Sequence, residues 1–478
     1  MLECASVRVP VTLFLVAVAA ASSARADLIH LKNGRSIWAD HVRENGTRVE
    51  YDIGDDSYAV PKNSVEKIEA GGVPPQYASA SASKDHDVPA FAPTSNLKNE
   101  SIVSDKVIRD GKVDVDALNA VEQGGDASAS AAAYFIAGKH EFETGNFVGA
   151  RKYFETALRF DSQNPTVLNY YAALLVRTGN PVEALLYAER AARVAPDSAD
   201  TLAVLGYAQF ASDRTADAIR SWKRSLSLRP DAMIQHYLEK AQREASAESD
   251  FSQRESGHFT LKYEGKQTSD SLRRGVIDTL ESEYDDLTRE LGIAPRGSIS
   301  VTLYTDQAFF DVTQAPSWSG AVNDGKLRIP VDGVSAVTPE LARVLKHELA
   351  HSFINHISGG RCPQWLNEGV AQVLEPKSLA SHGRRLAQIF KAQQEIPYNV
   401  LEGSFMQFST VQAMVAYDES LAAVEYINET YGMSDIRRIL ERLGQGSSTE
   451  AALRATVHSD YGQMETEVGK YLTDKFGD

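Results

Sequence analysis

Residues 341–357 read LARVLKHELAHSFINHI, and this stretch decides how the C-terminal half of the chain is interpreted. Its apolar residues recur at helical spacing, which predicts a helix with one face in a core. His347 and His351 are four positions apart, so both imidazoles lie on one helix face and can reach a single ion. Glu348 lies in the same turn but is displaced sideways, so its carboxylate can stand beside the ion without binding it. The spacing predicts a metal site on this helix.

A third ligand is expected further along the chain, because a catalytic zinc ion takes three protein ligands and keeps one position open. Glu368 lies in the segment WLNEGVA, residues 365–371. The interval after His351 allows the first helix to end, a loop to form at 358–360 and a second helix to return alongside. His356 is a poor alternative, because it lies off the face of His351. Glu368 is therefore the predicted third ligand.

The two motifs, HELAH at 347–351 and NEGVA at 367–371, together resemble those of the gluzincin peptidases, most closely the group called peptidase MA-like. The wider likeness covers residues 256–445. The resemblance implies a zincin-like α+β fold and a Zn²⁺ ion held by His347, His351 and Glu368. It also implies hydrolysis of peptide bonds in a peptide or protein substrate.

The resemblance also assigns roles around the ion. Glu348 is the expected general base, and a tyrosine from the later helices is the expected oxyanion donor, for which we choose Tyr417. Some gluzincins place a carboxylate one turn after the ligand glutamate, where this chain has Gln372. The residue that orients the imidazoles is therefore left open between Asn367 and Glu375.

The region around these motifs predicts an α+β domain over residues 256–478. Alternating segments at 257–263 and 299–304 predict strands, and 270–291 has helical periodicity. Asn323-Asp324-Gly325 is a hairpin signal between two short apolar segments. The second of these, Lys326 to Val331, either pairs with an extended substrate as an added strand or forms ordinary pairs in the core.

A repeat with a period of 34 residues precedes this domain, within residues 131–245. Small residues recur at this spacing in two registers: Ala150, Ala184 and Ala218, and Gly138, Ala172 and Gly206. Small residues let paired helices approach closely, and Pro196 and Pro230 end two of the units. The pattern resembles three tetratricopeptide (TPR) repeats, which form an α-helical solenoid. Such a solenoid either binds a protein partner or peptide on its concave surface or only braces the next domain.

The N-terminus reads as an export signal over residues 1–26. Val9 to Ala21 is an apolar run too short to span a bilayer, and Ala24-Arg25-Ala26 fits a small-x-small cleavage site. A periplasmic or secreted bacterial protein is expected, with no membrane span after cleavage; an uncleaved anchor is the alternative.

Two segments separate the signal from the repeats. Residues 27–70 contain short segments in which apolar and polar residues alternate, with turn signals between the segments. This pattern resembles small SH3-like β modules of exported bacterial proteins. Residues 71–130 are rich in Ala, Ser, Pro and Asp and predict a disordered linker that holds a short helix within 107–121.

The composition excludes several classes of function. The formal net charge of −16 argues against nucleic acid or an anionic membrane surface as the main partner. The chain has 2 cysteines, and only Cys362 lies outside the signal, so neither an internal disulfide nor a thiol enzyme is expected. The remaining alternative to a peptidase is a TPR scaffold whose C-terminal domain binds zinc without turnover.

Overall fold

The structure is a computed structural model that describes residues 26–32, 36–39, 41–53, 56–72, 100–266, 268–315, 321–331, 333–405 and 408–477. The chain divides into two compact units, Met1–Ala78 and Ser79–Asp478. The predicted export signal, apart from Ala26, and most of the predicted linker lie outside the described residues. None of the described helices has the length and apolar character that crossing a membrane requires.

The first unit is made of short strands. They are β1 (Ala26–Leu31), β2 (Ser36–Ala39), β3 (His41–Asn45), β4 (Arg48–Ile53), β5 (Asp56–Pro61) and β6 (Val65–Gly72), with a 3₁₀ turn at Lys62–Ser64. They form two three-stranded sheets, in the orders β2-β1-β6 and β3-β4-β5. Gly46 has φ +60° in the tight turn that pairs Asn45 with Arg48, as the Asn-Gly signal predicts. The predicted β module is therefore present, and its SH3-like character stays a prediction.

The second unit begins with helices and a small hairpin inside the predicted linker. These elements are α1 (Glu100–Val107), β7 (Ile108–Arg109), β8 (Lys112–Val113) and α2 (Val115–Gln123). The prediction of a disordered linker to residue 130 is therefore wrong from Glu100 onward. Asp114 and Asp126 cap the next two helices, and Val107 and Leu118 are buried. These caps and buried side chains are local features that the Ala, Ser, Pro and Asp content of the segment does not reveal.

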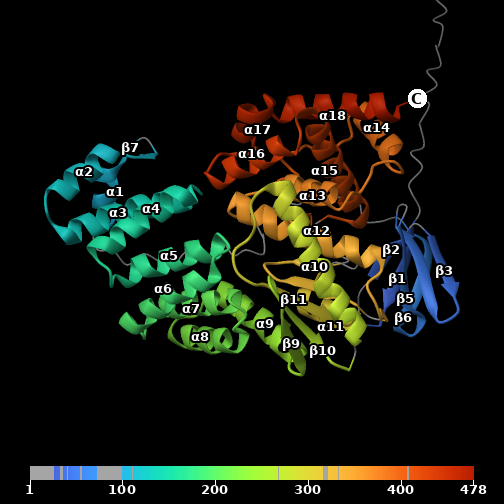
Figure 1. The fold of residues 1–478 in the computed structure, drawn as a ribbon, viewed down its shortest axis with the longest axis horizontal. Coiled ribbons are helices and arrows are strands. Elements are labelled where there is room, and N and C mark those ends of the chain that lie inside the picture. The colour runs from blue at the N-terminus through green and yellow to red at the C-terminus, as the bar shows by residue number, and fades with distance from the viewer. Residues whose placement is uncertain are drawn as a thin grey trace, which may run out of the picture. The chain divides into compact units, whose positions relative to one another are not determined.

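Paired helices follow, over the region with the 34-residue period (Figure 1). They are α3 (Ala127–Glu143), α4 (Phe147–Phe160), α5 (Pro165–Arg177), α6 (Pro181–Val194), α7 (Ala199–Ala211) and α8 (Thr215–Leu228), and α9 (Ala232–Ala247) packs on the last of them. An added Cβ at Gly138 would lie 2.6 Å from Phe154, and one at Gly206 would lie 2.5 Å from Trp222. The recurring small residues therefore make room for large rings of the paired helix. We call α3–α9 the helical array; its membership of the TPR class stays a prediction.

A five-stranded mixed sheet opens the C-terminal part. The strands β9 (Phe251–Glu255), β10 (Phe259–Glu264), β11 (Ile299–Tyr304), β12 (Val322–Asn323) and β13 (Leu327–Pro330) lie in the order β12-β13-β11-β10-β9. β13 pairs with β11 in parallel and with β12 in antiparallel register. Leu327–Pro330, within the segment Lys326 to Val331, therefore pairs inside the sheet, which favours ordinary core pairing over pairing with an extended substrate. β9 also shows that the sheet begins before residue 256, the predicted start of this domain.

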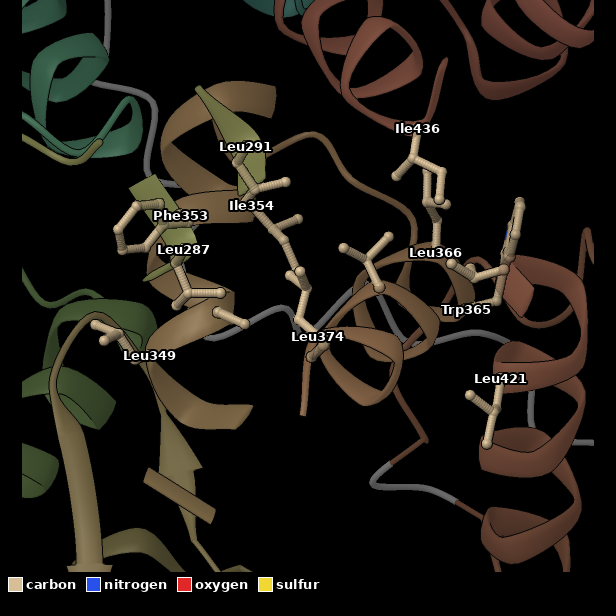
Figure 2. Close-up of a cluster of buried hydrophobic side chains, with 14 of the residues drawn as sticks. Leu287, Leu291, Leu349, Phe353, Ile354, Trp365, Leu366, Leu374, Leu421 and Ile436 are labelled. Atoms are coloured by element: carbon tan, nitrogen blue, oxygen red, sulfur yellow. The ribbon is translucent and has the colours of Figure 1, made fainter. Parts of the chain in front are cut away.

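Helices make up the rest of the chain. They are α10 (Asp270–Leu291), α11 (Asp306–Thr313), α12 (Pro339–Ser358), α13 (Gln364–Leu374), α14 (Gly383–Lys391), α15 (Thr410–Tyr431), α16 (Met433–Gly444), α17 (Thr449–Val457) and α18 (Tyr461–Phe476). α12 and α13 are the two helices that carry the metal-site motifs. Figure 2 shows Leu349 and Phe353 of α12 beside Leu287 of α10, while Leu366 of α13 lies near Ile436 of α16. Both motif helices are thus anchored in one hydrophobic core.

Candidate metal centre

Local signals in the sequence define where the two motif helices begin and end. Oγ1 of Thr338 accepts a hydrogen bond from the backbone N–H of Leu341, and Pro339 follows as the first helical residue of α12. Gly359 ends that helix in the left-handed conformation, with φ +59°. α13 starts after Pro363 and packs against α12. The short connection returns Glu368 to the face that carries His347 and His351.

The structure brings the three predicted ligands together. Nε2 of His347 lies 3.2 Å from Nε2 of His351. Oε2 of Glu368 lies 3.4 Å from Nε2 of His347 and 3.7 Å from Nε2 of His351. Among the described residues, this is the group of His, Cys, Asp and Glu side chains whose geometry could hold a metal ion.

The distances fit a tetrahedral ion. Zinc bonds to nitrogen and oxygen are about 2.0–2.1 Å long, so neighbouring ligand atoms on a tetrahedron lie about 3.3 Å apart. The three measured separations, 3.2, 3.4 and 3.7 Å, lie close to that value. Two imidazoles and a carboxylate are also the donor set that zinc takes in hydrolytic sites. The residues present therefore fit a zinc ion with three protein ligands.

A polar group lies on the far side of each imidazole, and at His351 a hydrogen bond selects the tautomer. Nδ1 of His351 donates to Oδ1 of Asn367 at 2.9 Å, which leaves a lone pair on Nε2. Nδ1 of His347 faces Oε1 of Glu375 at 3.6 Å. Asn367 therefore orients the imidazole of His351, while the carboxylate of Glu375 faces His347 beyond hydrogen-bond distance. Nε2 of His351 is thereby presented as a ligand.

Two glutamines make further hydrogen bonds around the three converging side chains, and neither of these hydrogen bonds was predicted from the sequence. Nε2 of Gln364 donates to Oε1 of Glu368 at 2.8 Å, so Oε2 is the oxygen that faces the imidazoles. Nε2 of Gln372 donates to the backbone carbonyl of Tyr417 at 2.9 Å and ties α13 to α15. Gln364 lies one turn before Glu368 on α13, and this spacing is the signal that could have identified it.

Burial and mutual charge shift the pKa values of the acidic groups in the cluster. Burial raises the pKa of Glu348, although the imidazoles of His351 and His347 oppose this. The same imidazoles outweigh burial at Glu368 and lower its pKa.

The pKa of His347 shifts in the direction that stabilises positive charge at this place. Burial alone would lower the pKa of His347, but Glu368 and Glu375 raise it to about 10. Two carboxylates therefore surround the imidazole of His347 with negative charge, which a bound divalent ion would offset.

Tyr417 lies at this site, on α15. Burial raises the pKa of its hydroxyl well above the ordinary value, and the carboxylates of Glu368 and Glu348 add to the shift. The hydroxyl is thus protonated at neutral pH and can donate a hydrogen bond. Cys362 lies close by in the chain, but burial raises the pKa of its thiol. A raised thiol pKa disfavours the reactive thiolate form.

The chain matches one family of known proteins and is distantly similar to two solved structures. A family model described as the Peptidase MA superfamily matches residues 283–474, which contain all the residues of the site. Two solved structures from Deinococcus radiodurans are similar, an M1 zinc metallopeptidase and a mutant of it. Their sequence identities are 18% and 16%, their TM-score is 0.28, and each match covers 46% of this chain and 50% of the other.

The likeness to these structures is distant. The chain spans half the length of the solved structures it matches, and at this TM-score the likeness carries no argument about activity. No curated protein matches the chain.

Proposed function

We propose that this protein is an exported zinc metallopeptidase that hydrolyses peptide bonds. The observation that supports it most is the convergence of two Nε2 atoms and one carboxylate oxygen at separations of 3.2–3.7 Å. Glu348 adds a buried carboxylate beside that point, 7% exposed, in the same helical turn as His347. The match to the Peptidase MA superfamily supports the same reaction class.

The side chains of the site divide the reaction between them. When bound, zinc supplies a Lewis acid that polarises the scissile carbonyl and makes a water acidic. Glu348 takes the proton from the attacking water and passes it to the leaving amine, a role that its raised pKa suits. The protonated hydroxyl of Tyr417 donates to the oxyanion that develops on the substrate. His347, His351 and Glu368 hold the ion throughout.

The proposal has two further parts. We propose that residues 1–26 direct export to the periplasm or the medium, with a mature chain that starts at Asp27; intact-mass measurement of the exported protein tests this. We also propose that the helical array binds the substrate or a partner protein in the manner of TPR repeats.

The experiment that tests the activity combines two variants and one control. Glu348→Gln should keep its zinc and lose about 10²–10⁴-fold in the rate of cleavage of a quenched fluorescent peptide library. Glu368→Ala should lose zinc. Glu340→Gln is the matched control, because Glu340 lies exposed in the first turn of the same helix. If Glu348→Gln still cleaves the peptides at the wild-type rate, the proposed peptidase mechanism is wrong. If the wild-type protein binds zinc but cleaves no peptide, the alternative of a TPR scaffold that binds zinc without turnover is favoured.

A further inference from the structure

Asn323 connects the β12–β13 hairpin directly to the helix of the metal ligands. Its Nδ2 donates to the backbone carbonyl of Glu348 at 2.7 Å and to Oγ of Ser352 at 2.8 Å. Its Oδ1 accepts from the backbone N–H of Gly325 at 3.1 Å, within the hairpin. Glu348 and Ser352 each follow a ligand histidine by one residue. The hairpin is therefore tied to the turn of α12 on which the two imidazoles stand.

Buried charges hold the same hairpin from the helical array. Both oxygens of Asp324 accept from Nε of Arg328, at 3.0 and 3.1 Å, and one of them lies 3.0 Å from Nζ of Lys240. Glu244 accepts from Nη2 of Arg328 and from Nζ of Lys326, both at 2.7 Å. Arg328 and Glu244 are 1% and 0% exposed. Lys240 and Glu244 belong to α9, so the array and the hairpin share one ion network.

The turn between α7 and α8 joins this network. Asp213 accepts from Nζ of Lys326 at 2.8 Å and from Nζ of Lys262 at 2.7 Å. The two ammonium groups lower the pKa of Asp213 in spite of its burial, so it remains charged. Each charge in the network has an opposite partner with defined geometry. Such a network adds little net stability over an apolar join, but removal of one partner leaves a buried charge uncompensated.

A second contact reaches the loop between the two motif helices. The guanidinium of Arg361 lies over the ring of Phe147, 5.6 Å from its centroid, and Arg177 lies over the same ring at 5.1 Å. An added Cβ at Gly145 would meet Nη1 of Arg361 at 1.5 Å, so the turn between α3 and α4 lies directly against it. The array thus contacts the chain before α12, at the hairpin, and after it, at residues 359–361.

We infer that the helical array is a brace for the metal centre and that Asn323 is the positioning residue through which it acts. A polar network with paired charges defines one register between array and hairpin, where an apolar contact would allow sliding. Through its two hydrogen bonds, Asn323 fixes the position of the Glu348–Ser352 turn of α12 relative to the hairpin. The inference rests on the metal site proposed above and does not require that the protein cleave any particular peptide. It leaves the remaining surface of the array available for a partner.

The test uses Co²⁺ in place of zinc in the full chain, because its visible absorption reports ligand geometry without a substrate. Asn323→Ala should shift these bands and weaken Co²⁺ binding by about 10-fold or more, as loss of an outer hydrogen-bond partner does. Asn323→Asp keeps the shape of the side chain but replaces the Nδ2 donor with an oxygen, so it should have the same effect as Asn323→Ala. Glu244→Gln and the milder Asp213→Asn should act in the same direction. Asp197→Asn is the control, because it breaks only an exposed ion pair of the array with Arg224.

A double-mutant cycle shows whether the array acts through Asn323. If it does, Asp213→Asn should change Co²⁺ affinity in the wild-type background and not in the Asn323→Ala background. Variants that only melt at a lower temperature, with unchanged bands and affinity, would overturn the inference and leave the proposed function intact. Wild-type protein that binds no Co²⁺ would overturn the metal site itself. If Glu244→Gln does not fold, Asp213→Asn carries the test, because Lys326 keeps Glu244 as a partner.

Discussion

Asn367 offers the simplest test of how the imidazoles are oriented. It accepts the hydrogen bond from Nδ1 of His351 and is not itself a ligand. Asn367→Ala should therefore lower zinc affinity by about 10–100-fold while the three ligands stay in place. Competition with a chromophoric chelator measures the affinity. Gln394→Ala, at an exposed position, is the control. An unchanged affinity would mean that packing alone holds the ring.

Glu419 should make stability depend on pH at a place away from the metal. Burial raises its pKa to about 8; the backbone N–H of Ile396 opposes the shift and the carboxylate of Glu395 adds to it. Between about pH 4.5 and 8 the folded chain holds a proton that the unfolded chain releases, so stability is lost as pH rises through this window. Glu419→Gln should flatten that loss and raise the melting temperature at pH 9 more than at pH 5.5.

The control for this variant is Glu290→Gln, at an exposed glutamate of α10. If the melting temperatures of the wild type and Glu419→Gln fall equally as pH rises, Glu419 is already ionised in the folded protein across this window.

At the residue scale, the sequence predicted which three side chains converge, because helical spacing alone places His347 and His351 on one face. Glu368 was found through its own motif. The choice between Asn367 and Glu375 could not be made in advance, because it depends on how α13 rotates against α12. Asn323 was seen only as part of a hairpin signal, since its contact with Glu348 joins segments that are 25 residues apart.

At the scale of elements, Gly369 sets how closely α13 approaches α15. An added Cβ would lie 2.3 Å from the backbone carbonyl of Ser420 and 2.5 Å from Val424. Gly369→Ala should force the helices apart and destabilise the fold by about 1–3 kcal/mol, in spite of the better helix propensity of alanine. Chemical denaturation measures the difference. Gly265→Ala is the control, because nothing lies within 4 Å of its added Cβ. Equal stability of both variants would show that α15 can yield.

Elements were predicted well where one pattern dominates. The helix at 270–291 and the strand at 299–304 coincide with α10 and β11. β9 was missed because its residues Phe251–Glu255 are mostly exposed and polar, as an edge strand can be. The short helix predicted within residues 107–121 overlaps α2, whereas α1 was missed because composition, averaged over a long segment, hides single capping and buried residues.

At the scale of the whole molecule, sequence reasoning divided the second unit into repeats and a separate C-terminal domain. The structure keeps both within one compact unit, Ser79–Asp478. The charges that join them, such as Glu244 and Arg328, are 84 residues apart and show no periodicity that would reveal the contact. A network of this kind depends on tertiary arrangement and cannot be found from local patterns.

The shared network makes a prediction about cooperativity. If the array and the metal centre unfold together, zinc should protect both against hydrogen exchange, because a ligand that binds only the folded state stabilises every residue of its cooperative unit. At a free zinc concentration of about 100 times Kd, the gain should be about 2.7 kcal/mol for amides that exchange only by global opening. These include core residues of the array such as Leu174 and of the motif helix such as Leu349.

Protection confined to α12 and its neighbours, with α5 and α7 unchanged, would show that the array unfolds independently. Glu368→Ala should abolish the effect of zinc in both parts and so confirm that it arises at the metal centre.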